Sequence, residues 1–160
     1  MSRFIRGAAL LSGAALLGAS GVAAPANAAG AAALVTCTSG SLSLLVSGGA
    51  VIGNGTVSGC TGPSGVTSAN IAVRGTRTVN TLTQLVLNSS DAFFWNNGAS
   101  TLVTTVRTIT GASTVADAGT GTTTSGQFHP AAEAEAAKGT RSNNSTGQTI
   151  RLTFTNLTLS

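Results

Sequence analysis

Apolar and polar positions alternate along most of the chain with a period of two. The last stretch, QTIRLTFTNLTL (148–159), shows this pattern most clearly. The apolar side chains of Ile150, Leu152 and Phe154 share one face. The threonine and arginine side chains between them share the other. This spacing predicts a strand with one buried face and one solvated face. The phase reverses before Leu157, which predicts either a bulge near Asn156 or a strand that crosses to a second sheet.

Similar segments, rich in β-branched and aromatic residues, recur along the chain, and clusters of Gly, Ser, Asn and Pro separate them. They cover residues 33–39, 41–47, 50–59, 70–75, 78–87, 92–95, 100–110 and 148–159. About eight short strands at this spacing are typical of a sandwich or a barrel. We predict an all-β fold, an antiparallel β-sandwich of about eight short strands with one disulfide and at most one short helix.

Two Asn-Gly pairs predict tight hairpin turns, because both residue types tolerate positive φ. The first pair, Asn97-Gly98, follows AFFW, and the second, Asn54-Gly55, lies within GGAVIGNGTVSG. The low-complexity segment GTGTTTSG (119–126) is predicted to form an edge strand or a loop.

The first 28 residues are predicted to be a secretory signal peptide. Arg3 and Arg6 precede the apolar run GAALLSGAALLGA, and ANA (26–28) is a typical cleavage site. No later stretch reaches the roughly 18 apolar residues that a membrane helix needs. We therefore expect residues 29–160 to form a single secreted domain without a membrane span.

The expected mature domain carries few charges. Its six basic and four acidic residues leave a net charge of +2, and the basic residues are scattered along the chain. A nucleic-acid interface needs clustered Lys and Arg, usually with aromatic residues. We therefore do not expect nucleic acid as a partner.

Cys37 and Cys60 are the only cysteines. An even pair in an exported chain predicts a disulfide. A metal site is the alternative, but His129 is the only histidine and neither cysteine belongs to a C-x-x-C motif. We predict the disulfide, no metal and no cofactor.

The stretch QFHPAAEAEAAKG (127–139) holds the only histidine, both glutamates and the only lysine. Local propensity favours a short helix that starts at Pro130, which would place Glu133 and Glu135 on nearly opposite faces. The alternation of Ala and Glu favours an edge strand instead, with both carboxyls on one face roughly 7 Å apart, a separation used in sugar hydrolysis. Between these alternatives we favour a short helix or an irregular loop over residues 129–138.

We expect these charged side chains to be solvated and not catalytic. A general acid needs a carboxyl whose pKa is raised by burial, and the neighbouring alanines, lysine and glycine predict exposure. His129, oriented by Glu133 four residues later, could activate a serine, but no G-x-S-x-G motif occurs. We therefore predict no catalytic residue.

The stretch FFWNNGASTLVTTVRTITG, followed by GTGTTTSGQF and a terminal β-strand, resembles a group of small exported actinobacterial proteins. The group shares an N-terminal cysteine pair, a W-N-x-G-x-S/T hairpin and a G-T-x-T-S-G-x-F segment. The resemblance covers about the C-terminal two thirds of the chain. It implies a β-sandwich, and an edge strand for the Ala/Glu stretch, but no activity, since the group is uncharacterised.

The segment FFWNN (93–97) is the remaining candidate for recognition. Phe93 and Trp95 share one face of a strand, and Phe94 lies on the other, so one of the two faces belongs to the core. An outward Trp95 would stack on a sugar or anchor a partner, whereas an inward one would pack the hairpin. The predicted binding residues are Trp95, Phe93, Asn96 and Asn97.

Together these features predict a secreted, non-catalytic binding or structural protein of the cell surface or extracellular space. Its partner is not identified by the sequence; envelope carbohydrate and another surface protein are the two classes considered. The alternative is a secreted hydrolase that acts on envelope polysaccharide through Glu133 and Glu135. That alternative requires a cleft flanked by both carboxyls and Trp95.

Overall fold

The computed structural model describes residues 34–160, so the predicted signal peptide (1–28) lies outside the described residues. Eight strands follow one another along this part of the chain. Their bounds are Val35–Ser47 (β1), Ala50–Thr61 (β2), Ser68–Asn80 (β3), Gln84–Trp95 (β4), Ser100–Thr110 (β5), Thr114–Gly126 (β6), Ala132–Asn144 (β7) and Gly147–Leu159 (β8). One 3-10 turn, η1 (Pro63–Gly65), is the only helical element in this range, and no helix in it is long and apolar enough to cross a membrane.

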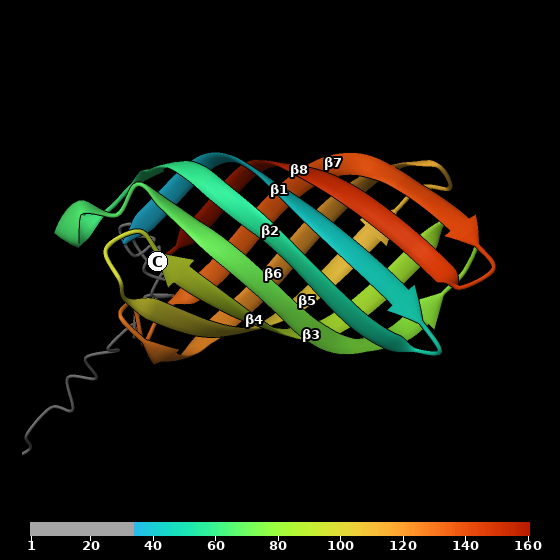
Figure 1. The fold of residues 1–160 in the computed structure, drawn as a ribbon, viewed down its shortest axis with the longest axis horizontal. Coiled ribbons are helices and arrows are strands. Elements are labelled where there is room, and N and C mark those ends of the chain that lie inside the picture. The colour runs from blue at the N-terminus through green and yellow to red at the C-terminus, as the bar shows by residue number, and fades with distance from the viewer. Residues whose placement is uncertain (1–33) are drawn as a thin grey trace, which may run out of the picture. The chain divides into compact units, whose positions relative to one another are not determined.

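The strands close into one antiparallel barrel, in which each strand pairs with its neighbours in sequence and β8 returns to β1. Figure 1 shows this seam, with β1 near the blue end of the colour scale beside the red β8. Along the seam Val35 lies opposite Leu159, and Val46 lies opposite Gln148. The predicted sandwich is therefore wrong. The fold of residues 34–160 is all-β with eight strands, but each strand is paired on both sides, so this part of the chain has no sheet edge.

The last strand confirms the alternation read from the sequence. Ile150, Leu152 and Phe154 are buried and the residues between them are exposed, and Leu157 and Leu159 are buried after the change of phase. A β-bulge causes the reversal of phase: Ala136 of β7 lies opposite Asn156 and Ala137 opposite Phe154, which leaves Thr155 unpaired. The bulge predicted near Asn156 is confirmed, and the crossing to a second sheet does not occur.

The first hairpin turns earlier than predicted. Its turn lies at Gly48-Gly49, between β1 and β2. Asn54 and Gly55, the predicted turn, lie inside β2 and pair with both neighbouring strands. A local Asn-Gly signal is overridden here by the pairing of two long strands.

The hairpin at Asn97-Gly98 is confirmed, with a different turn geometry. The loop has four residues (96–99), and the amide of Gly98 donates to the carbonyl of Trp95. Gly98 has a φ of 85°, which a residue with a side chain rarely adopts, whereas Asn97 is not in this region. The predicted tight turn, in which both Asn97 and Gly98 would have positive φ, is therefore not formed.

Two strands lie where the sequence predicts none or only an edge. β6 covers the low-complexity segment, and β7 covers the charged stretch for which we favoured a helix or a loop. β6 pairs with β5 and β7, and β7 pairs with β6 and β8. Neither strand is an edge strand.

Aromatic side chains fill the barrel at the end that holds the turns after β2, β4 and β6. Phe93 stacks on Trp95 with ring centroids 5.5 Å apart, and Phe128 meets Trp95 edge-on at 5.3 Å. Trp95 Nε1 donates a hydrogen bond of 2.9 Å to Thr101 Oγ1, which satisfies the polar group of the buried indole.

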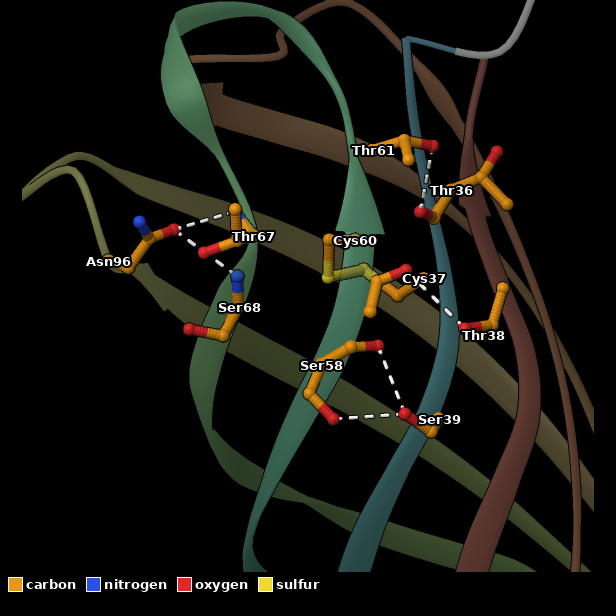
Figure 2. The surroundings of a disulfide bond; sticks show 11 residues. Thr36, Cys37, Thr38, Ser39, Ser58, Cys60, Thr61, Thr67, Ser68 and Asn96 are labelled. Atoms are coloured by element: carbon orange, nitrogen blue, oxygen red, sulfur yellow. Dashed lines mark hydrogen bonds between the residues drawn. A yellow bond between two sulfur atoms is a disulfide. The ribbon is translucent and has the colours of Figure 1, made fainter.

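Cys37 and Cys60 form the predicted disulfide at the same end. They lie directly opposite each other on β1 and β2, as Figure 2 shows. Next along the two strands, the hydroxyl groups of Ser39 and Ser58 are hydrogen-bonded at 2.9 Å. Because the bridge joins two facing residues, it fixes the register of the first hairpin.

Candidate functional site

All four acidic residues of the chain face the interior of the barrel. Asp91 lies on β4, Asp117 on β6, and Glu133 and Glu135 on β7, and each is at most 5% exposed. The fully buried Arg107 of β5 lies among them. We call these five residues the charged cluster. They occupy four consecutive strands, whereas the inward residues of β8, β1 and β2 are mostly apolar.

Glu133 and Glu135 overturn the prediction for the charged stretch. Both lie on the inward face of a strand, so the predicted helix or loop and the predicted solvation are wrong. The alanines that flank them in sequence (Ala132, Ala134 and Ala136) are exposed on the outer face. Because a strand has a period of two, outward alanines turn the glutamates between them into the core.

Two glycines of β6 make room for these glutamates. Gly121 lies opposite Glu133, and Gly119 lies opposite Glu135. A Cβ atom at position 119 would lie 2.6 Å from Cγ of Glu135, and one at position 121 would lie 2.6 Å from Oε2 of Glu133. Each glutamate side chain therefore crosses over β6, toward β5.

We expect Gly121→Ala to destabilise the barrel by about 1–3 kcal/mol, as overpacking does. The new methyl group would also lie 2.6 Å from the carbonyl oxygen of Thr104, which is backbone and cannot rotate away. Chemical denaturation measures the change. Thr120→Ala, on the outer face of the same strand, is the control and should cost under about 0.5 kcal/mol. An unchanged denaturation midpoint for Gly121→Ala would show that Glu133 does not cross over β6.

Arg107 connects β5 to β4 and β7. Its Nη1 donates to Ser89 Oγ at 2.9 Å, and its Nη2 donates to Asp91 Oδ2 at 2.5 Å. Glu135 meets the guanidinium twice, Oε1 at 2.5 Å from Nε and Oε2 at 3.1 Å from Nη2. Burial by itself lowers the pKa of Arg107, but Glu135 and Asp91 outweigh burial and the pKa is raised. The guanidinium is therefore charged, and it holds two carboxylates from different strands.

Glu133 and Asp117 are the members of the cluster that Arg107 does not contact. Thr105 Oγ1 donates to Glu133 Oε2 at 2.6 Å, while neither carboxyl oxygen of Asp117 has a hydrogen-bond partner within residues 34–160. Burial, with a further contribution from Glu135, raises the pKa of Glu133 to about 8 and that of Asp117 to about 7. Both carboxyls therefore hold protons in mildly acidic solution.

The charged cluster contains the groups that acid–base catalysis uses, but these groups also have a structural role, because their hydrogen bonds and ion pairs join β4, β5 and β7. A neutral carboxyl beside an ionised one is the arrangement of many general acid–base sites. The same contacts satisfy Arg107 in the core. In the part of the chain that the structure describes, no three His, Cys, Asp or Glu side chains are placed to hold a metal ion.

His129 lies apart from the cluster. It is in the loop between β6 and β7, its side chain is exposed as predicted, and its Nδ1 donates to the carbonyl of Thr123 at 2.8 Å. No hydrogen bond joins it to Glu133, which turns into the barrel. Glu133 therefore does not orient His129, as the catalytic alternative read from the sequence would require.

The aromatic residues of FFWNN follow the predicted division of faces. Phe93 and Trp95 point into the core and are nearly inaccessible, whereas Phe94 points outward and is 53% exposed. The structure thus places Trp95 inside the barrel, in the packing role.

The two asparagines of this segment hold loops together. Asn96 Oδ1 accepts hydrogen bonds from the amides of Thr67 and Ser68, as Figure 2 shows. Asn97 Nδ2 donates to Gln127 Oε1 at 3.1 Å. These contacts join the three loops at the disulfide end. A binding role for Trp95, Phe93 and the two asparagines stays a prediction.

An open groove of about 830 Å³ crosses the outer wall from β3 over β2, β1 and β8 to β7. We call it the outer groove. Its exposed side chains all carry hydroxyl, amide or guanidinium groups: Ser41, Ser43, Asn54, Thr56, Asn70, Thr140, Arg151 and Thr153. Seven of these eight side chains are short, so the wall is hollowed where they lie.

Strand pairing places these groups in continuous rows. Ser43 lies between Asn54 and Arg151, and Arg151 lies between Ser43 and Thr140. Neighbouring strands are about 4.8 Å apart, so the polar groups recur at that spacing across the wall. No sequence signal reveals this groove, because its residues come from five strands whose register is known only in the fold.

Sequence reasoning also missed Asp91, Arg107 and Asp117, although a signal for them exists. Each lies in phase with the apolar, inward positions of its own strand. A charged residue at a core position of a strand is buried once the register is formed, and it then requires a partner. The three residues could have been singled out on this ground.

The fold and these sites define the chain as a closed eight-stranded antiparallel barrel with a buried charged cluster and a polar groove on its outer wall. In comparisons with protein-family models, with curated proteins and with solved structures, the chain matches none of them. The resemblance to small exported actinobacterial proteins therefore stays a prediction.

Proposed function

We propose that the protein is a secreted, non-catalytic binding protein that holds an extracellular polysaccharide in the outer groove. The observation that carries this proposal is the lining of the groove, where eight exposed polar side chains surround about 830 Å³. Sugars carry closely spaced hydroxyl groups that both donate and accept hydrogen bonds. Hydroxyl and amide side chains also donate and accept hydrogen bonds, so they can pair with sugar hydroxyl groups in either role.

The secreted location is supported by two features. The disulfide between Cys37 and Cys60 is of a kind that persists in oxidising compartments outside the cytosol. The predicted signal peptide (1–28) provides the route.

A secreted polysaccharide hydrolase is the second candidate. It is favoured by Glu133, whose pKa burial raises to about 8, beside a second carboxyl on the same face of the strand. Two observations weigh against it. Neither glutamate lines the outer groove, because both point to the other side of the wall, and Arg107 occupies both oxygens of Glu135.

Polysaccharide binding tests the proposal. We expect the purified secreted protein to bind at least one member of a panel of neutral and anionic polysaccharides in calorimetry. Ser43→Trp, which fills the middle of the groove, should weaken that binding at least about tenfold because the ligand loses its contact surface. Thr104→Trp, exposed on β5 outside the groove, is the matched control and should leave the affinity unchanged.

Equal losses in both tryptophan variants, or no binding by the wild type, would contradict the proposal. The same samples test the hydrolase. Reducing ends that the wild type releases and Glu133→Gln does not would assign the protein to the second candidate.

A further inference from the structure

The barrel holds all of its negatively charged side chains in its interior. All four carboxylate side chains lie inside, around Arg107. The charged side chains exposed on its outer wall are therefore all basic, namely Arg74, Lys138 and Arg151. An outer cation on this wall has no side-chain carboxylate with which to pair.

Arg151 is the cation that lies within the outer groove. Its guanidinium makes no ion pair and no hydrogen bond with any side chain or carbonyl in residues 34–160, and its neighbours across the strands are Ser43 and Thr140. A guanidinium has five donors and no acceptor, in a planar arrangement that matches the two oxygens of a phosphate or a carboxylate. Hydroxyl neighbours can complete the contacts to such an anion.

Lys138 adds a second positive charge at the edge of the groove. It lies on β7 opposite Thr153, while Arg151 lies on β8 opposite Thr140. The two cations are thus diagonal neighbours on one face, with Cα atoms about 7–8 Å apart. That spacing lets them contact one anionic group together or two successive groups along a polymer.

From this geometry we infer that the outer groove is specific for an anionic polysaccharide, with Arg151 and Lys138 forming the subsite for its phosphate or carboxylate groups. The inference rests on the proposed function and deepens it. None of the described residues that line the groove is aromatic, so these residues offer the bases of a single-stranded nucleic acid no ring on which to stack. The hydroxyl and amide side chains around the cations suit sugar hydroxyls instead.

The experiment compares three polymers by calorimetry at low and at physiological salt: poly(glycerol phosphate), polygalacturonate and neutral dextran. Single-stranded DNA of similar charge is a fourth probe. The variants are Arg151→Gln and Lys138→Gln, with Arg74→Gln as the matched control, since it removes the same charge from the same wall outside the groove. Arg151 and Lys138 are both exposed, so thermal melting should confirm that all variants fold.

We expect one of the two anionic polysaccharides to bind at least about tenfold more tightly than dextran, and the tighter one identifies the anion as phosphate or carboxylate. Arg151→Gln should weaken this binding about tenfold or more, Lys138→Gln by less, and Arg74→Gln by under about twofold. Salt should weaken the binding of the wild type more than that of Arg151→Gln.

Three results would contradict the proposal that Arg151 and Lys138 form an anion subsite. An equal loss in Arg74→Gln would indicate diffuse surface charge, equal binding of dextran would show that no anion is recognised, and equal binding of DNA would indicate a general polyanion surface. If dextran binds as tightly as the anionic polysaccharides, the proposal that the groove holds a polysaccharide still stands. If none of the polysaccharides binds, that proposal fails together with this one.

Discussion

The free energy of unfolding should fall by several kcal/mol as the pH rises from 5 to 8. In the barrel the pKa of Asp117 is about 7 and that of Glu133 about 8, because both carboxyls are buried. In the unfolded chain both pKa values return to roughly 4. Between these limits the folded state binds more protons than the unfolded state, so stability decreases with rising pH. The stability is fully present below about pH 4 and is lost at about 1.4 kcal/mol per pH unit for each group.

Urea denaturation at pH 5, 6.5 and 8 measures this effect. Asp117→Asn removes one of the two titrations, since an amide is neutral at every pH, and should roughly halve the slope of stability against pH. The variant should also be more stable than the wild type at pH 8, because it cannot place a charge where no partner exists. Lys138→Gln, on the outer wall, should leave the slope unchanged. A stability that is constant or rises from pH 5 to pH 8 would contradict the buried placement of these carboxyls.

Arg107→Met should destabilise the barrel by about 3–5 kcal/mol at pH 7. Methionine retains much of the volume of the side chain but removes the charge that holds Asp91 and Glu135. Both carboxylates would then be buried without a cation, and the hydroxyl of Ser89 would lose its donor. Thermal and urea denaturation at fixed pH measure the loss.

Two controls separate charge from packing in this variant. The loss should shrink at pH 5 and in the double variant Arg107→Met/Glu135→Gln, because both remove negative charge from the interior. Arg74→Met, on the outer wall, should change stability by under about 0.5 kcal/mol. If Arg107→Met costs the same at pH 5 and pH 8, its effect comes from packing alone and the charged cluster has no electrostatic role.

The sequence predicts the strands better than their arrangement. A period of two arises in a sandwich and in a barrel alike, because each buries one face of every strand. The distinguishing contact, Val35 opposite Leu159, joins the two ends of the described chain and leaves no local pattern. Glycines inside strands also lead to wrong strand boundaries in the sequence prediction. Gly40 separates two predicted segments (33–39 and 41–47), but it lies within β1 opposite Phe154, whose ring would meet a Cβ there at 3.1 Å.

For the charged stretch, the sequence points to the important residues but not to their environment. The spacing of Glu133 and Glu135 on one face of a strand was among the alternatives weighed, and it is correct. Their burial was missed because it depends on residues from other strands, such as Gly119 on β6 and Arg107 on β5, 28 positions before Glu135. Neighbours in sequence report only the outer face of such a strand.

The seam between β1 and β8 also determines the order in which the fold can be completed. Val35 and Leu159 lie 124 positions apart (159 − 35), so the pairing that closes the ring can form only after the other seven strands of the barrel have been made. Until β8 has emerged, one side of β1 has only unpaired amides and carbonyls, although β2 is already available to pair with its other side. Pairings of such long sequence separation form slowly, and an open edge invites other chains meanwhile. The growing chain is therefore most exposed to misassembly just before the 13 residues of β8 are made, and a chain cut short before β8 would keep two open edges permanently, on β1 and on β7.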